Sequence, residues 1–120
     1  MGWSFSPNAP IYIQISESLK NAMLKGIYPP GSQLPSVRQI AKDAAVNPNT
    51  VQKSVSLLES EGLVVVRGTQ GCFVTEDTAF LNKAKRQTAQ RLAKEIVLAA
   101  KDISLEPELL LNLIKEEFDK

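Results

Sequence analysis

The stretch LPSVRQIAKDAAVNPNTVQKSVSLL, residues 34–58, predicts two short amphipathic helices with a tight connection between them. Ser36 is a suitable N-cap for the first helix, and Gln39 three residues later predicts a capping box. Asn47 can cap the second helix, in which Pro48 takes the first position without losing a hydrogen bond. Apolar residues recur at helical spacing in both segments: Val37, Ile40, Ala41 and Ala44, then Val51, Val55 and Leu58. Two such helices joined by residues 45–48 are typical of a helix-turn-helix.

The residues after this stretch predict a β-hairpin. Gly62 ends the second helix, and the valine-rich run 63–66 favours a strand, because β-branched side chains pack well on a pleated sheet. The sequence Gly68-Thr69-Gln70-Gly71 supplies a turn, and residues 72–75 supply the return strand. We interpret this hairpin as the wing of a winged helix-turn-helix.

The residues before the stretch predict one further helix. Pro10 suits its opening turn, and Gly26 ends it. Between these two positions the apolar residues recur at helical spacing: Ile11, Ile15, Leu19, Ala22 and Met23. The sequence YPPGS, residues 28–32, then predicts a rigid turn at which the chain reverses direction.

The last third of the chain predicts a helical hairpin. From Thr78 onward one face of a long helix carries Leu81, Thr88, Leu92, Ile96, Ala99 and Ile103. Residues 104–107 interrupt this helix, and a short second helix carries Leu109, Leu110, Leu113, Ile114 and Phe118. The predicted fold is mainly α with a small β-hairpin wing (α+β). We assign DNA binding to residues 1–76 and dimerisation to residues 77–120.

Composition limits the classes of function. The 120 residues are 43% hydrophobic and 22% charged, which is typical of a folded globular protein. There is no histidine and a single cysteine, Cys72, so an internal disulfide is excluded and a metal site is disfavoured. Without a nucleophile motif or a glycine-rich phosphate loop, we expect no enzymatic activity and no cofactor. No apolar run can span a bilayer and residues 1–4 do not begin a signal peptide, so we expect a cytoplasmic protein with no membrane partner.

The second helix of the helix-turn-helix has a polar face with the chemistry to recognise bases. Asn49, Gln52, Lys53 and Ser56 stand at positions i, i+3, i+4 and i+7, opposite the apolar stripe. Amide side chains can bond the edge of adenine, and a lysine can bond guanine or a phosphate. The alternative is an ordinary solvated helix face.

Several separated motifs occur in the order typical of one family of regulators. They are LPSVRQIA (34–41), VNPNTV (46–51), EGL (61–63) and GCFV (71–74), with PIY (10–12) at the start. In these motifs the chain resembles the GntR family of winged helix-turn-helix transcription regulators. The Asn-Pro-Asn-Thr sequence and a tail of only two helices resemble the YtrA subfamily.

The resemblance implies contacts with double-stranded operator DNA. The residues at the family's contact positions are Ser36, Arg38, Asn47, Asn49, Thr50, Gln52 and Lys53. Many members carry arginine at the positions of Pro48 and Gln52, so base preference cannot be transferred. In the wing we expect contacts from Arg67, Thr69, Gln70 and Gly71, although this wing tip lacks the family's arginine between two glycines.

The resemblance also implies that the chain is a repressor of a transporter or envelope-stress operon. The two helices of the tail can cover each other's apolar faces only partly, so we expect a homodimer with twofold symmetry that binds an inverted repeat. We predict the dimer interface on the tail at Leu81, Leu92, Ile96, Ala99, Ile103, Leu109, Leu110, Leu113 and Ile114. The tail is too short to enclose a usual ligand pocket of ~300 Å³ or more, and no effector is indicated. A winged-helix module that binds proteins instead of DNA is the alternative, because it fits the net charge of only +1.

Three further features each have two interpretations. Cys72 could be a redox switch, but a thiol in a strand without a nearby base is more often structural. Trp3 and Phe5 could line a ligand site, cover the core or contact a partner. The cations Lys83, Lys85 and Arg86 could contact DNA flanks or form a solvated helix face.

Overall fold

The computed structural model describes residues 2–120 and confirms a mainly helical fold with a small two-stranded sheet. The elements follow in the order α1 (Ile11–Lys25), α2 (Val37–Ala44), α3 (Pro48–Ser60), β1 (Val64–Val66), the 3-10 turn η1 (Gly68–Gln70), β2 (Cys72–Val74), α4 (Thr78–Asp102) and α5 (Pro107–Phe118). The chain divides into two compact units, of which the second is Ala84–Lys120. The assignment of separate functions to residues 1–76 and 77–120 stays a prediction.

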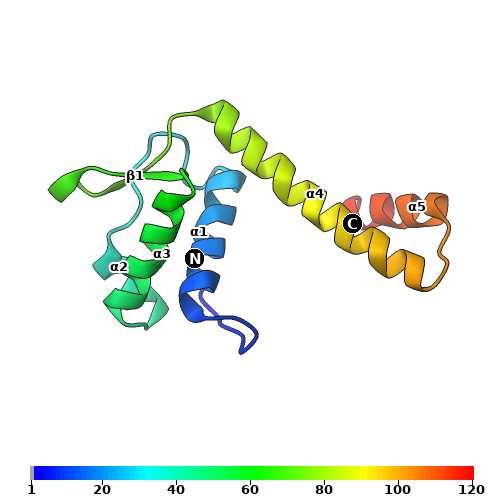
Figure 1. Cartoon of the computed structure of the whole chain (residues 1–120), viewed down its shortest axis with the longest axis horizontal. Coiled ribbons are helices and arrows are strands. Elements are labelled where there is room, and N and C mark those ends of the chain that lie inside the picture. The colour runs from blue at the N-terminus through cyan, green and yellow to red at the C-terminus, as the bar shows by residue number, and fades with distance from the viewer. Residues whose placement is uncertain (1) are drawn as a thin grey trace. The chain divides into compact units, whose positions relative to one another are not determined.

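The core of the first unit lies where α1, α2 and the strands pack around α3, and α1 and α3 lie side by side (Figure 1). The predicted stripes of these helices supply most of the core, which includes Ile15, Leu19, Ile40, Val51, Val55 and Leu58. Burying one such aliphatic side chain contributes about 1.5–3 kcal/mol. Ser54 is also fully buried, and its hydroxyl donates to the Tyr12 carbonyl at 2.7 Å. This hydrogen bond fixes α3 against the start of α1.

The ends of α2 differ in part from the prediction. The Ser36 hydroxyl accepts from the Gln39 amide at 3.1 Å, as a capping box requires. The Gln39 side chain makes no bond with the Ser36 amide and instead donates from Nε2 to Asp43 Oδ1 at 2.8 Å. Only half of the predicted capping box is therefore present. At the other end, Ala45 takes a left-handed conformation with φ of 56°, and the Val46 amide donates to the Ala41 carbonyl at 3.0 Å.

The wing hairpin has the predicted antiparallel pairing and one addition. Val64 pairs with Val74 and Val66 pairs with Cys72. The segment before α2 lies along the other edge of β2, where Gln33 forms an isolated bridge with Phe73. The Leu34 amide donates to the Cys72 carbonyl at 2.9 Å. The sequence predicts only a chain reversal at the YPPGS turn. In the structure this turn also places the extended segment around Gln33 beside β2.

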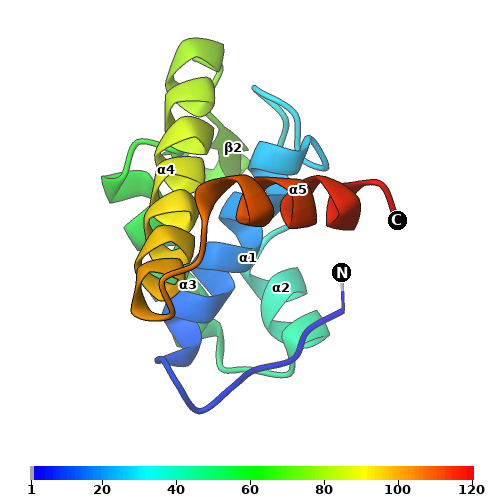
Figure 2. The same ribbon diagram turned by 90° about the vertical axis from the view of Figure 1, so that its right-hand side faces the viewer.

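The second unit contains the C-terminal part of α4 and all of α5, which cross one another in both views (Figures 1 and 2). Ser104 ends α4 in a left-handed conformation with φ of 52°, and the Leu105 amide donates to the Ala100 carbonyl at 3.0 Å. Large apolar side chains remain exposed in this unit: Leu92, Ile96, Val97, Leu98, Ile103, Leu109, Leu111, Leu113 and Phe118. Leu110 and Ile114 are half-buried.

Leu81 requires a correction. Its side chain is only 7% exposed, and the residue belongs to the first unit rather than to the tail. The apolar stripe that begins at Leu81 continues along α4. The side chain of Leu81, however, is covered by other residues of the same chain. Leu81 therefore offers little apolar surface to a second chain.

Candidate nucleic-acid interface

The face of α3 opposite the core is exposed along its length. Asn49, Gln52, Lys53 and Ser56 are all exposed, whereas Val51, Val55 and Leu58 are buried. The spacing of polar and apolar residues in the sequence thus gives the predicted two-sided helix. The polar groups on this face include two carboxamides, which can each donate and accept at a base edge.

The start of α3 is fixed by its own cap. The Asn47 side-chain oxygen accepts from the Asn49 amide at 2.8 Å, and Pro48 occupies the first helical position. The Asn47 oxygen is thus engaged in capping, while its amino group is a donor that can contact DNA. Thr50 is half-buried in the same first turn, where its amide donates to the Asn47 carbonyl at 3.0 Å. The Asn47 cap and Pro48 thus fix where α3 begins.

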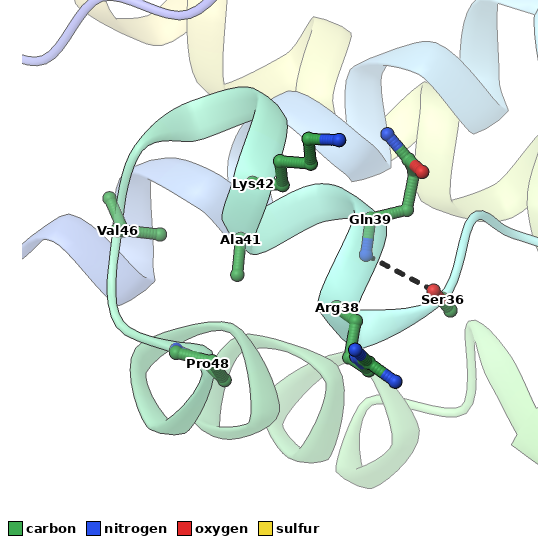
Figure 3. Close-up of a pocket in the computed structure, with 7 residues that line it drawn as sticks. All are labelled: Ser36, Arg38, Gln39, Ala41, Lys42, Val46 and Pro48. Atoms are coloured by element: carbon green, nitrogen blue, oxygen red, sulfur yellow. Dashed lines mark hydrogen bonds between the residues drawn. The ribbon is translucent and has the colours of Figure 1, made fainter.

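An open hollow lies between α2 and the start of α3 (Figure 3). Its volume is about 630 Å³, and it is lined by Ser36, Arg38, Gln39, Ala41, Lys42, Val46 and Pro48. Figure 3 shows the bonded Ser36 and Gln39 at one end of the hollow and Val46 at the other. Two cations, Arg38 and Lys42, line it and are exposed, as a phosphate contact requires. Sequence reasoning missed Lys42, although its position one turn after Arg38 on α2 is a usable signal.

Lys53 makes a contact that the sequence did not predict. Its ammonium nitrogen lies 4.1 Å from the centroid of the Tyr12 ring. This cation–π contact joins α3 to the start of α1 and orients the lysine toward that helix. The side chain remains exposed, so its charge is still available to a phosphate.

A second hollow, of about 420 Å³, lies between α3 and the wing. It brings the predicted residues Gln52 and Ser36 together with Thr69, Gln70 and Gly71 of the wing. Its lining includes the apolar side chains of Val55 and Val66. Residues that are far apart in the sequence thus face a single groove beside the exposed face of α3.

Arg67 lies between β1 and the turn η1, directly beside the wing tip. Its guanidinium carbon is 4.9 Å from the centroid of the Phe73 ring, so it is held against β2. The wing tip itself, Gly68–Gln70, carries no charged side chain. A contact from this tip to DNA therefore depends on hydroxyl, amide and backbone groups.

Cys72 lies on β2 beside the groove and is half-buried. Burial, with a smaller contribution from the Glu59 carboxylate, raises the pKa of its thiol from 9.0 to about 11. The thiolate is the reactive form of cysteine, so this raised pKa supports the structural interpretation of Cys72.

At pH 8 we expect Cys72 in the folded protein to react with a disulfide reagent about a hundredfold more slowly than in the denatured chain. A pKa near 11 leaves about one hundredth of the thiolate that a pKa of 9.0 gives. The rate of thionitrobenzoate release in native buffer and in guanidinium measures this difference. Equal rates in the two conditions would show that the thiol is not protected.

The remaining sequence candidates lie outside these grooves. Trp3 and Phe5 stack with ring centroids 6.1 Å apart, and both are half-buried. Lys83, Lys85 and Arg86 are exposed on α4. Within residues 2–120, no group of three or more metal-binding side chains is present. None of the helices in that range is long and apolar enough to span a membrane.

Two helices packed at a tight turn, followed by a hairpin beside the second helix, define a winged helix-turn-helix protein. Residues 11–74 match the model of bacterial regulatory proteins of the gntR family, and the chain belongs to this family. It is a DNA-binding transcription regulator, and the prediction that it is not an enzyme is confirmed by this membership. The resemblance to the YtrA subfamily is confirmed by the relatives that follow.

Similar proteins match nearly the whole chain. The HTH-type transcriptional repressor YtrA of Bacillus subtilis (strain 168) is 36% identical over 110 residues, which are 91% of this chain and 85% of that protein. The uncharacterized regulator YhcF of the same organism is 33% identical over 111 residues, 92% of each chain. A GntR family transcriptional regulator from Listeria monocytogenes has a TM-score of 0.89 at 26% identity, and the match covers 93% of this chain and 98% of that one.

Some of the similar structures include DNA. The DNA-binding domain of AraR in complex with operator ORE1 has a TM-score of 0.56 at 25% identity. The match covers 62% of this chain and 93% of that domain.

Proposed function

We propose that this chain represses transcription by binding an inverted-repeat operator as a homodimer, with α3 in the major groove. The observation that carries the proposal is the exposed face of α3 with two grooves beside the helix. One groove, between α2 and the start of α3, is lined by the cations of α2, and the other lies between α3 and the wing. This arrangement suits a helix that reaches base edges while its neighbours contact the flanking phosphates.

The proposed DNA contacts fall into three groups. Asn49 and Gln52 contact bases, because their carboxamides can bond adenine at two positions. Residues around these two contact phosphates: Ser36, Arg38, Asn47, Thr50 and Lys53. The wing residues contact the DNA beside α3: Arg67, Thr69, Gln70 and Gly71. We add Lys42 to the phosphate group because it lines the same hollow as Arg38. The AraR complex supports this assignment, since a domain of similar fold is seen there with operator DNA.

The proposed dimer interface lies on the second unit. Leu92 and Ile96 are exposed on one face of α4, Ile103 is exposed directly after its end, and Leu109 and Leu113 are exposed on α5. Ala99, Leu110 and Ile114 complete the predicted set without Leu81. A second copy related by a twofold axis offers the same apolar surface, so the contact can close on itself.

Repression is proposed from the similarity to YtrA, whose name describes a repressor. A transporter or envelope-stress operon as the target is proposed only from the resemblance to the YtrA subfamily. The alternative function is a winged-helix module that binds another protein. Titrating a fluorescent duplex at increasing salt distinguishes DNA binding from protein binding. The logarithm of the affinity for DNA falls linearly with the logarithm of the salt concentration, and the slope increases with the number of phosphates that the protein contacts. Binding that falls steeply with salt is expected. An absence of binding at low salt would contradict the proposed function.

We expect Arg38→Ala and Lys53→Ala to weaken binding to all duplex sequences and to reduce the salt slope by about one each, because phosphate contacts do not depend on sequence. Fluorescence anisotropy at several salt concentrations measures the slope. Lys115→Ala on α5 is the matched control, since it removes a cation from a helix outside the proposed DNA contacts and should leave the slope unchanged. Unaltered slopes for Arg38→Ala and Lys53→Ala would remove these residues from the phosphate contacts.

A further inference from the structure

The wing tip is joined to the segment before α2 by the side chain of Gln33. The Gln33 amide nitrogen Nε2 donates to the Gln70 carbonyl at 2.8 Å. The backbone of Gln33 forms the isolated bridge with Phe73 on β2. Gln33 therefore contacts both the edge of the sheet and the end of the turn η1.

Gly71 has no side chain, which leaves room for the side chain of Gln33 beside the turn. A Cβ placed on Gly71 would lie 2.6 Å from Gln33 Nε2, closer than such atoms approach one another. The φ of Gly71 is +120°, which L side chains rarely adopt. The Gln33 carboxamide thus occupies the space that a side chain at residue 71 would need.

The turn that Gln33 braces is the part of the wing that faces the groove beside α3. The Arg67 amide donates to the Gly71 carbonyl at 2.9 Å, and the Gln70 amide donates to the Arg67 carbonyl at the same distance. These two bonds close the turn on itself. The hydrogen bond from Gln33 to the Gln70 carbonyl joins this turn to the segment that continues into Ser36 and α2.

We propose that Gln33 is a positioning residue for the wing, which sets the tip at a fixed place beside Gln52 without touching DNA. The tip carries no charge, so its contacts depend on the exact placement of hydroxyl, amide and backbone groups. A tip that moves relative to α3 loses such short-range contacts more readily than it would lose the attraction of an arginine. This inference rests on the proposed function, in which the wing contacts DNA beside α3.

The test replaces Gln33 with methionine, which keeps the length of the side chain and removes the N–H donor. Amide hydrogen exchange in the free protein should show the Gln70 amide exchanging about three- to tenfold faster, because a net hydrogen bond is lost from the turn.

Affinity is then measured for two duplexes that contain a repeat selected from a random pool. One has flanking base pairs that the wing can reach, and the other is trimmed to the repeat. Gln90→Met on the exposed surface of α4 is the matched control.

The expected result is a loss of about three- to tenfold on the flanked duplex, and a smaller change on the trimmed duplex. Unchanged exchange at Gln70 would show that Gln33 does not brace the turn. Faster exchange with equal losses on both duplexes, or with no loss on either, would show that Gln33 does not act through the wing. Failure of the unaltered protein to bind either duplex would overturn the proposed function, and this inference with it.

Discussion

Replacing Ile96 with aspartate is expected to produce a monomer whose affinity for an inverted-repeat duplex is lower by about a hundredfold or more. Ile96 is 41% exposed in the single chain, in the middle of the apolar face of α4. A carboxylate buried there against a second copy would have no partner, at a cost of several kcal/mol. Loss of the dimer also separates the two DNA-binding units, and linked sites typically gain about 10²- to 10⁴-fold in affinity.

Leu98→Asp is the matched control for this prediction. Leu98 is exposed on the same helix, but two residues from Ile96 it points about 200° away around the helix axis. Sedimentation should show a dimer for the unaltered protein and for Leu98→Asp, and a monomer for Ile96→Asp. An unaltered protein that stays monomeric at micromolar concentration, or an Ile96→Asp variant that stays dimeric, would place the interface elsewhere.

Substituting the carboxamides of α3 is expected to change base preference instead of affinity as a whole. Asn49→Ala and Gln52→Ala should each reduce discrimination at particular base pairs by ~1–3 kcal/mol, because each removes a paired contact with a base edge. Affinities for a series of duplexes, each with one base pair changed, measure this effect. The unaltered protein should distinguish those base pairs by about 5- to 150-fold, and the variant should not.

Lys53→Ala is the comparison within the same face of α3. A lysine that contacts phosphate carries no sequence information, so its loss should weaken every duplex in the series by a similar factor. If Asn49→Ala and Gln52→Ala behave in the same uniform way, these residues position the helix on DNA and do not recognise bases.

Helix ends show how far local sequence predicts the fold. Gly26 and Gly62 are predicted to end α1 and α3, and both take left-handed conformations there. Ala45 and Ser104 take the same conformation at the ends of α2 and α4, where no glycine indicates it. At both positions the amide of the next residue donates to a carbonyl of the last helical turn, Val46 to Ala41 and Leu105 to Ala100. Such bonds can form around residues other than glycine, so the residue type alone does not predict these two helix ends.

The candidate site was predictable where it depends on one helix. The period of α3 placed Asn49, Gln52 and Lys53 on a single exposed face, and the structure has them there. Contacts between distant segments were not predictable from the periodicity. Gln33 meets Gln70 across 37 positions of sequence, and Lys53 lies over Tyr12.

The tail shows a different limit. A helical stripe indicates which residues are apolar on one side of α4, but it does not indicate what covers each part of that side. Leu81 is covered by the first unit, whereas Ile96 and Ile103 further along the stripe are exposed. The distinction depends on where α4 leaves the winged helix-turn-helix, which is a property of the folded chain.

Selection of bound duplexes from a random-sequence pool tests the central claim most directly, because the pool contains every short operator sequence and favours none of them. The full chain is incubated with the pool at moderate salt, and the retained duplexes are amplified and sequenced over several rounds. We expect enrichment of an inverted repeat whose half-site centres are about 10 base pairs apart or a multiple of that distance. Recovery of duplexes with no common sequence, or of a single half-site without its inverted copy, would contradict it.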